Sequence, residues 1–370
     1  MTISDPAISA LLSARIAAGD FPSAVYLVAQ KWEIKLAGVL GNAVVEPQSI
    51  PATLDTVYDL ASLTKPLITG MLCARRVERG DLSLEKSVSD YLPEFDRPDK
   101  RSITVKSLLT HSSGLPAWRA LYVITGGDRA RTLQAIADVD LEYQPGTGVV
   151  YSDLGFIVLG LLLERITNKT LKELADQEIF QPLALKQTFF SPEQAMQTGI
   201  AACESGNMFE RDMLRKTNND DSAHWREELI WGSVHDGNAY FLGGVAGHAG
   251  LFSNANETLL VASQFLGLST RLLSPATCEL FSQNLTIGLD EARSFGWQLA
   301  ETKDSAAGLD LPRNSFGHSG FTGTSCWIDP NDSRIYILLT NRTHARALPF
   351  ANINPVRRQF HTLAQAALTS

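Results

Sequence analysis

Strand-like segments at both ends of the chain, separated by a long helical middle, constrain the fold more than any other feature. Apolar and β-branched runs indicate strands at residues 24–29, 33–39, 297–300, 326–329 and 334–341. The first two flank the short connection Lys31-Trp32 and predict a hairpin, and residues 355–368 predict a last helix. Because strands from both ends enclose helical runs, we expect the termini to build one antiparallel sheet.

The predicted fold class is therefore α+β, with an antiparallel sheet flanked by helices and a second, mostly helical part. Residues 1–370 are expected to form a single unit. Its sheet subdomain comprises residues 1–60 and 290–370, and its mainly helical subdomain comprises residues 61–289. The polar residues 207–223 predict a loop over a cleft or a disordered excursion at the surface.

The tetrad Ser62-Leu63-Thr64-Lys65 is an S-x-x-K sequence that directly precedes an apolar helical run. Residues i and i+3 share one face of a helix, so the Lys65 amine is expected to contact the Ser62 hydroxyl and help to remove its proton. The helix N-terminus also favours negative charge that develops at Ser62. Residues 83–86 have the same spacing but lie in a turn-like stretch, so we interpret Ser83 as a loop residue.

Two later segments add polar side chains at the starts of regular elements. Tyr151-Ser152-Asp153 follows the turn at residues 145–148 and precedes the apolar run 156–163, so it caps another buried helix. His318-Ser319-Gly320 opens a segment that continues into the strand-like residues 325–328.

These three motifs, in this order, resemble the active-site motifs of the serine β-lactamase and penicillin-binding protein superfamily. The class C branch, with its related esterases and D-amino peptidases, is the most similar group. Residues 108–116 and 243–252 also resemble stretches typical of that branch. The resemblance covers nearly the whole chain and implies a β-lactamase/transpeptidase-like fold whose site lies in the cleft between sheet and helical region.

The resemblance also implies a role for each motif in a covalent mechanism. Ser62 attacks a carbonyl carbon and becomes acylated, while Lys65 accepts its proton or lowers its pKa. Tyr151 is expected to be the general base, as a phenolate that Lys65 stabilises. The backbone N–H groups of Ser62 and Phe321 are expected to form the oxyanion hole, with Phe321 presented by an edge strand.

Four further residues are expected to bind the substrate: Asp153, His318, Ser319 and Gly320. Asp153 stands where the family usually has Asn, and His318 stands where a Lys usually binds a carboxylate. A histidine with its ordinary pKa of about 6.5 is mostly neutral at pH 7 and becomes a cation only as the pH falls. The substrate is therefore expected to be a small ester, a D-amino-acid peptide, a muropeptide fragment or a β-lactam, and esterase, amidase or peptidase activity is favoured over β-lactamase activity.

Two other interpretations stay open at this point. The run Gly317-His318-Ser319-Gly320 prompts a Ser-His-Asp α/β-hydrolase, although Phe321 replaces the last glycine of G-x-S-x-G. The other alternative is a non-catalytic binding or sensor module with the same fold.

The composition and the motifs of the sequence predict that the binding partner is a small-molecule or peptide substrate. A net charge of −8 without Lys or Arg clusters argues against nucleic acid. The histidines lack metal-ligand spacing, and residues 243–250 lack P-loop and dinucleotide-binding contexts, so we expect no metal and no cofactor. The longest apolar stretch is too short to span a bilayer. Residues 1–13 lack the features of a signal peptide, and the four cysteines are scattered, so we expect a cytoplasmic protein.

Overall fold

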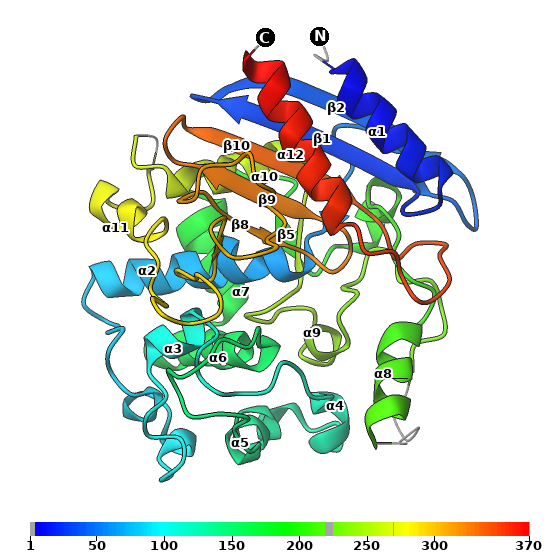
Figure 1. Ribbon diagram of the computed structural model, residues 1–370. Helices are drawn as coiled ribbons and strands as arrows, with labels where there is room; N and C mark the ends of the chain where they lie inside the picture. The colour runs from blue at the N-terminus through cyan, green and yellow to red at the C-terminus, as the bar shows by residue number, and fades with distance from the viewer. Residues whose placement is uncertain (1–3, 219–224, 269, 370) are drawn as a thin grey trace.

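The computed structural model describes residues 4–218, 225–268 and 270–369. Its main feature is a seven-stranded sheet, drawn near the top of Figure 1, in which every neighbouring pair is antiparallel. The strands, in sheet order, are β3 (Ile50–Pro51), β2 (Glu33–Val44), β1 (Ser23–Gln30), β10 (Arg334–Thr340), β9 (Ser325–Asp329), β8 (Phe316–Ser319) and β7 (Gln298–Leu299). Strand β1 pairs with β10, so the two ends of the chain do form one sheet, as predicted.

The sheet is buried on both faces, which explains why its central strands read as continuous apolar runs. Along β1, Tyr26 and Val28 belong to a core with helices α1 (Pro6–Ala17) and α12 (Asn354–Thr369). Alternate residues such as Leu27 pack into the larger core on the opposite face. Figure 1 shows α1 and α12 side by side over the sheet, with both termini at the same end.

The middle of the chain supplies most of the helices, as predicted. They are α2 (Met71–Glu78), α3 (Val105–Leu109), α4 (Leu121–Ile124), α5 (Thr132–Asp138), α6 (Asp153–Thr167), α7 (Leu171–Ala175), α8 (Met208–Asn218), α9 (Gly237–Phe241), α10 (Ala255–Ala262) and α11 (Pro275–Leu280). Helix α10 packs against β1 and β10. Figure 1 places α3, α4, α5 and α6 below the sheet.

Two features differ from the sequence-based expectation for the middle of the chain. The expected loop at 207–223 begins instead with helix α8, while residues 219–223 lie outside the described residues. A small sheet of β4 (Tyr58–Asp59), β6 (Leu251–Ser253) and β5 (Phe189–Phe190) was not predicted. Strands of two or three residues are too short to show a period in sequence.

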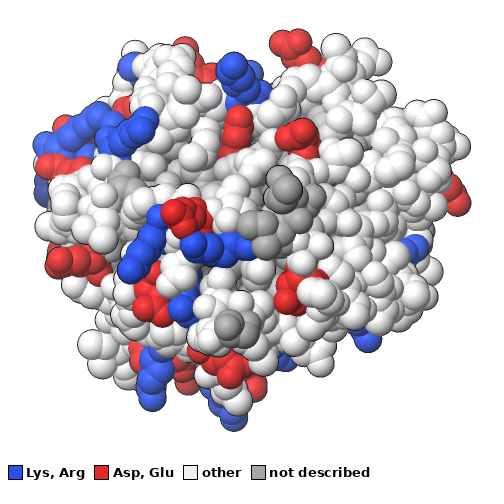
Figure 2. All heavy atoms as spheres, turned by 90° about the horizontal axis from the view of Figure 1, so that it is seen from above, with Lys and Arg blue, Asp and Glu red and all other residues white. Residues whose placement is uncertain are grey.

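Figure 2, which views the molecule from above, shows acidic and basic side chains interspersed on that face. In the described ranges, no helix is long and apolar enough to cross a membrane.

Candidate active site

Ser62 lies at the start of a helical segment, but its immediate turn is not a regular α-helix. Residues Ala61–Leu63 form a 3-10 turn, residues Lys65–Gly70 form π-helical turns, and α2 follows directly. The expected α-helix is therefore replaced, over the tetrad itself, by tighter and then wider turns, which often mark functional sites. Ala61 adopts a φ of 47°, a left-handed conformation that a non-glycine residue holds only when its surroundings enforce it.

The surroundings of Ser62 do enforce that backbone conformation. The Asp59 carboxylate accepts a hydrogen bond from the Ala61 N–H at 2.8 Å. The Thr324 hydroxyl donates to the Leu60 carbonyl oxygen at 3.0 Å. Gly320 fits between these groups, since a Cβ added there would lie 2.5 Å from the Leu60 oxygen. The predicted His-Ser-Gly motif thus abuts the segment that carries the nucleophile.

Lys65 is completely buried, and its amine contacts three oxygen atoms. Its Nζ donates to Ser62 Oγ at 2.9 Å and to the His248 carbonyl oxygen at 3.1 Å. The same Nζ forms an ion pair with Asp153 Oδ1 at 2.7 Å. Burial alone lowers the pKa of Lys65, but the Asp153 carboxylate, followed by Tyr151, raises it above the usual value. The resting state is therefore an ammonium ion, which matches its three acceptors.

Tyr151 reaches the same group from the start of α6. The Ser152 hydroxyl caps α6 by accepting from the Gly155 N–H at 3.2 Å, as the sequence predicted. The ring of Tyr151 lies 4.8 Å from Lys65 Nζ. Burial raises the pKa of Tyr151, and the Lys65 charge offsets this only in part. The raised pKa favours the phenol form in the resting site, and the role of Tyr151 as a phenolate base stays a prediction.

His111 holds Tyr151 and was not singled out by the sequence. Its Nδ1 accepts a hydrogen bond from the Ser152 N–H at 3.0 Å, and its ring packs at a tilt against the Tyr151 ring, with the ring centroids 4.7 Å apart. Burial, and then the charges of Arg293 and Lys65, hold the pKa of His111 well below its usual value. A neutral ring is required here, since only an unprotonated Nδ1 accepts the Ser152 hydrogen.

His318 is also neutral, which corrects the expectation that it becomes a cation near pH 6.5. It lies in β8, with its Nδ1 donating to the Ser319 carbonyl oxygen at 2.9 Å. Burial, and then the cations Lys65 and Arg293, keep the pKa of His318 well below 6.5. Its ring lies 5.6 Å from that of Tyr151. His318 therefore borders the catalytic tyrosine candidate without supplying a charge for a substrate carboxylate.

The glycine-rich segment at residues 243–250 has a structural role beside Lys65. A Cβ at Gly247 would lie 2.0 Å from the Phe156 carbonyl oxygen, so only glycine permits this close contact with α6. The Gly247 oxygen accepts from the Thr69 hydroxyl at 2.7 Å, and the next carbonyl, that of His248, contacts Lys65. The segment thus places a hydrogen-bond acceptor, the His248 carbonyl oxygen, beside Lys65.

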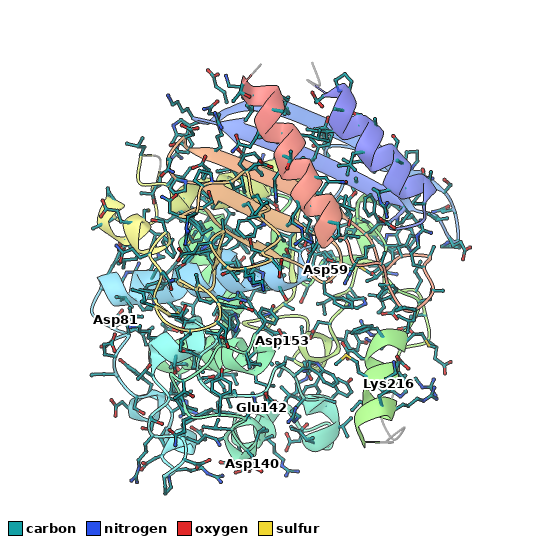
Figure 3. The ribbon with its side chains drawn as sticks, viewed as in Figure 1. Asp59, Asp81, Asp140, Glu142, Asp153 and Lys216 are labelled. Atoms are coloured by element: carbon teal, nitrogen blue, oxygen red, sulfur yellow. The ribbon has the colours of Figure 1, made fainter. Side chains whose placement is uncertain are left out.

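A cavity of about 170 Å³ opens directly onto Ser62. Asp153 lines this cavity, and Figure 3 shows Asp153 below the sheet beside α6. The described lining of the cavity comprises Ala61, Ser62, Trp118, Tyr151, Asp153, Phe209, Glu210, Met213, His235, Asp236, Ala249 and Phe321. Of the predicted substrate-binding residues, Asp153 therefore lines this cavity, whereas His318, Ser319 and Gly320 do not.

Phe321 is one of the residues that line this cavity. The ring packs 4.6 Å from the Phe209 ring and 5.3 Å from the His235 ring. Among the residues described, none accepts a hydrogen bond from the Phe321 N–H, which leaves this donor available. The strand before Phe321, β8, was expected to be an edge strand. This expectation is only partly right, because β7 pairs with β8 at Phe316 and Gly317 but ends before His318.

A second and larger cavity of about 810 Å³ lies next to the first. Glu210 lines both, and its carboxyl accepts from the Tyr122 hydroxyl at 2.8 Å and from the Gly237 N–H at 2.7 Å. Sequence reasoning did not identify Glu210, because it falls in the segment interpreted as a surface loop. Within 4–218, 225–268 and 270–369, no group of three or more His, Cys, Asp or Glu side chains is arranged to hold a metal ion.

Comparisons with known proteins show which family this chain resembles over most of its length. A family model described as "Beta-lactamase" matches residues 8–354. A "Putative D-alanyl-D-alanine carboxypeptidase" of Escherichia coli (strain K12) is 31% identical over 335 residues, covering 82% of this chain and 73% of the relative. An "N-acetylmuramyl-L-alanine amidase" of Bacillus subtilis (strain 168) is 33% identical over 367 residues, covering 91% and 80%.

Solved structures show the same fold at lower identity. "EstCE1, a hydrolase with promiscuous acyltransferase activity" aligns with a TM-score of 0.73 and 23% identity, covering 96% of this chain and 97% of that one. A "class C beta lactamase from Rhodobacter sphaeroides" aligns with a TM-score of 0.73 and 22% identity, covering 98% and 99%. This fold has an antiparallel sheet, which contradicts the α/β-hydrolase alternative built on Ser319.

Proposed function

The chain belongs to the beta-lactamase family of serine hydrolases, and we propose that it cleaves an ester or amide bond through a covalent acyl intermediate on Ser62. The observation that carries this proposal is the 2.9 Å hydrogen bond from Lys65 Nζ to Ser62 Oγ at the wall of a cavity. Tyr151 lies against the same ammonium group. A nucleophile, a proton-transfer unit and a space for the reacting carbonyl therefore occur together.

Acylation begins with loss of one proton from the resting unit of Lys65 ammonium and Tyr151 phenol. The deprotonated unit then accepts the Ser62 hydroxyl proton while Ser62 Oγ bonds to the carbonyl carbon. The N–H groups of Ser62 and Phe321 donate to the oxyanion of the tetrahedral intermediate. The bond to the leaving group breaks next, and that group departs with the proton held by the unit.

Deacylation repeats these steps with water as the nucleophile. The deprotonated unit takes a proton from water while the water oxygen bonds to the acyl carbon. The acyl–oxygen bond to Ser62 breaks, and Ser62 Oγ recovers its proton from the unit. Asp153 stays paired with Lys65 in this scheme and controls how readily the unit loses its first proton.

The charges of the site support a substrate without a carboxylate beside the scissile bond. No Lys or Arg occurs in the described lining of the 170 Å³ cavity, and the pKa of His318 is well below 6.5. A carboxylate anchor is thus missing, and β-lactams are the least supported substrates. Small esters, D-amino-acid peptides and muropeptide fragments fit better, and the amide named for the Bacillus subtilis relative belongs to the last group.

Covalent labelling with a neutral fluorophosphonate, followed by peptide mapping, tests the nucleophile. We expect one adduct, on Ser62. An adduct on Ser319 or on Ser83 would overturn the assignment, and no adduct would favour a non-catalytic module. A panel of short-chain esters, D-amino-acid amides, muropeptide fragments and cephalosporins then defines the substrate class.

A further inference from the structure

Glu210 occupies the junction of the two cavities. Its side chain lines the 170 Å³ cavity that contains Ser62 and the 810 Å³ cavity beside it. The residue is only 6% exposed, so its carboxyl is largely removed from bulk water. A cavity of about 150 Å³ holds one benzene-sized ligand in another protein. A small substrate group placed against Ser62 therefore lies within the same space as the Glu210 carboxyl.

The contacts of Glu210 are made with neutral donors. Oε1 accepts from the Gly237 N–H at 2.7 Å, and Oε2 accepts from the Tyr122 hydroxyl at 2.8 Å. A Cβ at Gly237 would lie 2.1 Å from Oε2, so glycine is needed for the carboxyl to rest against the backbone. In the described part of the chain, no Lys or Arg forms an ion pair with Glu210.

The other charged groups nearby already have partners. Asp153 pairs with Lys65 at 2.7 Å, and Asp236 pairs with the His248 ring at 2.8 Å. The Arg226 guanidinium donates to Asn207 Oδ1 and to two carbonyl oxygens at 2.6 to 2.7 Å. Among the described carboxyls that line the 170 Å³ cavity, Glu210 is thus the one that no Lys, Arg or His side chain contacts.

We propose that Glu210 is a specificity-determining residue, whose carboxylate binds a primary ammonium group of a substrate whose scissile carbonyl lies at Ser62. This inference rests on the proposed function and names its substrate class: esters or amides that carry an amine close to the reacting carbonyl. An ammonium ion supplies the charge and the donors that Glu210 lacks, and it gains strength from the low exposure of the site.

Binding of an ammonium ligand should depend on pH through Glu210 itself. Burial, and then the Asp236 charge, raise the pKa of Glu210 to about 7, while the Gly237 N–H and Tyr122 act against this rise. His235 and the Arg226 guanidinium also act on Glu210, and both charges favour its ionised form. The carboxyl is ionised above this pKa, so an ammonium ligand binds more tightly as the pH rises through 7, up to the pKa of its own amine.

Calorimetric titration of the Ser62→Ala protein measures this binding without any turnover. The ligands are alaninamide, which carries an ammonium group, and N-acetylalaninamide, which is neutral, each as both enantiomers. We expect alaninamide to bind at least tenfold more tightly than its acetylated form, and roughly tenfold more tightly at pH 7.5 than at pH 5.5. The acetylated ligand should show no such pH dependence.

Adding Glu210→Gln should weaken alaninamide binding by about 10- to 100-fold and leave N-acetylalaninamide within about twofold. Asp212→Asn is the matched control, because it removes a carboxylate from the same helix. Asp212 pairs at 2.6 Å with Lys216, which is labelled on α8 in Figure 3, and both side chains of this ion pair are exposed. Asp212→Asn should leave the affinities for alaninamide and for N-acetylalaninamide unchanged.

Equal losses for both ligands would show that Glu210 only shapes the cavity, and unchanged affinities would place the ammonium group elsewhere. Either result overturns the inference. Thermal unfolding of each variant checks that the fold is intact. The Ser62 labelling experiment is independent of these titrations, so failure of the acyl-enzyme proposal and failure of ammonium recognition are distinguishable.

Discussion

Lys65 Nζ lies 2.7 Å from Asp153 Oδ1, and this ion pair of a buried lysine with a half-buried aspartate lies beside the Ser62 hydroxyl. Burial lowers the pKa of Lys65, whereas the Asp153 carboxylate raises it, and the carboxylate prevails. Asp153 therefore favours the protonated form of Lys65, although Lys65 belongs to the unit that must accept a proton during acylation. This relationship makes the pH dependence of turnover a property of Asp153 as much as of Lys65.

Asp153→Asn should move the rising limb of kcat/KM against pH to lower pH. Without the carboxylate, burial dominates and the pKa of Lys65 falls, so the proton-accepting form is populated earlier. We expect a displacement of roughly one pH unit or more for a neutral ester. Asp140→Asn, a change at an exposed position, is the control, and superimposable profiles for all three proteins would refute this role.

Ser62→Ala should reduce turnover by about 10³-fold or more while thermal unfolding stays nearly unchanged. Ser83→Ala, in the second S-x-x-K sequence, should retain activity close to that of the unmodified protein. The measurement is kcat for any ester found in the substrate panel. Comparable losses in the two variants would rule out Ser62 as the nucleophile.

Tyr151→Phe and Lys65→Ala should each be severe, and the double variant should be scarcely slower than either single variant. The Lys65 amine lies 4.8 Å from the Tyr151 ring, and we propose that the two groups transfer protons as one unit. A double-mutant cycle on kcat/KM measures the coupling. Multiplicative losses would mean that the two residues act independently.

Gly320→Ala should lower kcat by about 10²-fold and reduce the melting temperature. Its Cβ would lie 2.1 Å from Thr324 Oγ1 and 2.5 Å from the Leu60 oxygen, so the segment before Ser62 must shift. Gly199→Ala is the control, because a Cβ at Gly199 meets nothing within 4 Å. If both variants behave alike, the contact between the His-Ser-Gly turn and the nucleophile segment has no catalytic importance.

The His318 ring should remain neutral at pH 6.5 and above. Burial and the nearby cations favour the uncharged ring, so its protonation occurs only at lower pH. Carbon-13 edited NMR of the histidine rings, assigned with His318→Gln, measures the titration directly. A midpoint at or above 6.5 would restore the idea of a carboxylate anchor at this position.

Much of the fold was predictable because its signals are local. The strands near both termini are apolar runs bounded by turn residues, and Ser152 precedes a long apolar helix that it caps. The S-x-x-K spacing likewise predicted the contact between Lys65 and Ser62, since both residues lie within one helical turn. These features depend on neighbours within a few residues.

The state of the site, in contrast, depends on contacts that only the tertiary structure creates. The pKa of Lys65 is raised by Asp153 from α6, and its amine donates to the His248 carbonyl oxygen; these residues are 88 and 183 positions away. From sequence alone, His318 is expected to have the ordinary pKa of a histidine. Burial and cations from distant parts of the chain lower that pKa and keep the ring neutral. Glu210 lies in a polar segment of the sequence and reaches the cavity because α8 folds back against Tyr122 and Gly237. Sequence spacing fixes which groups share an element, whereas burial and Coulomb interactions between elements fix their protonation, and these appear only after the chain has packed.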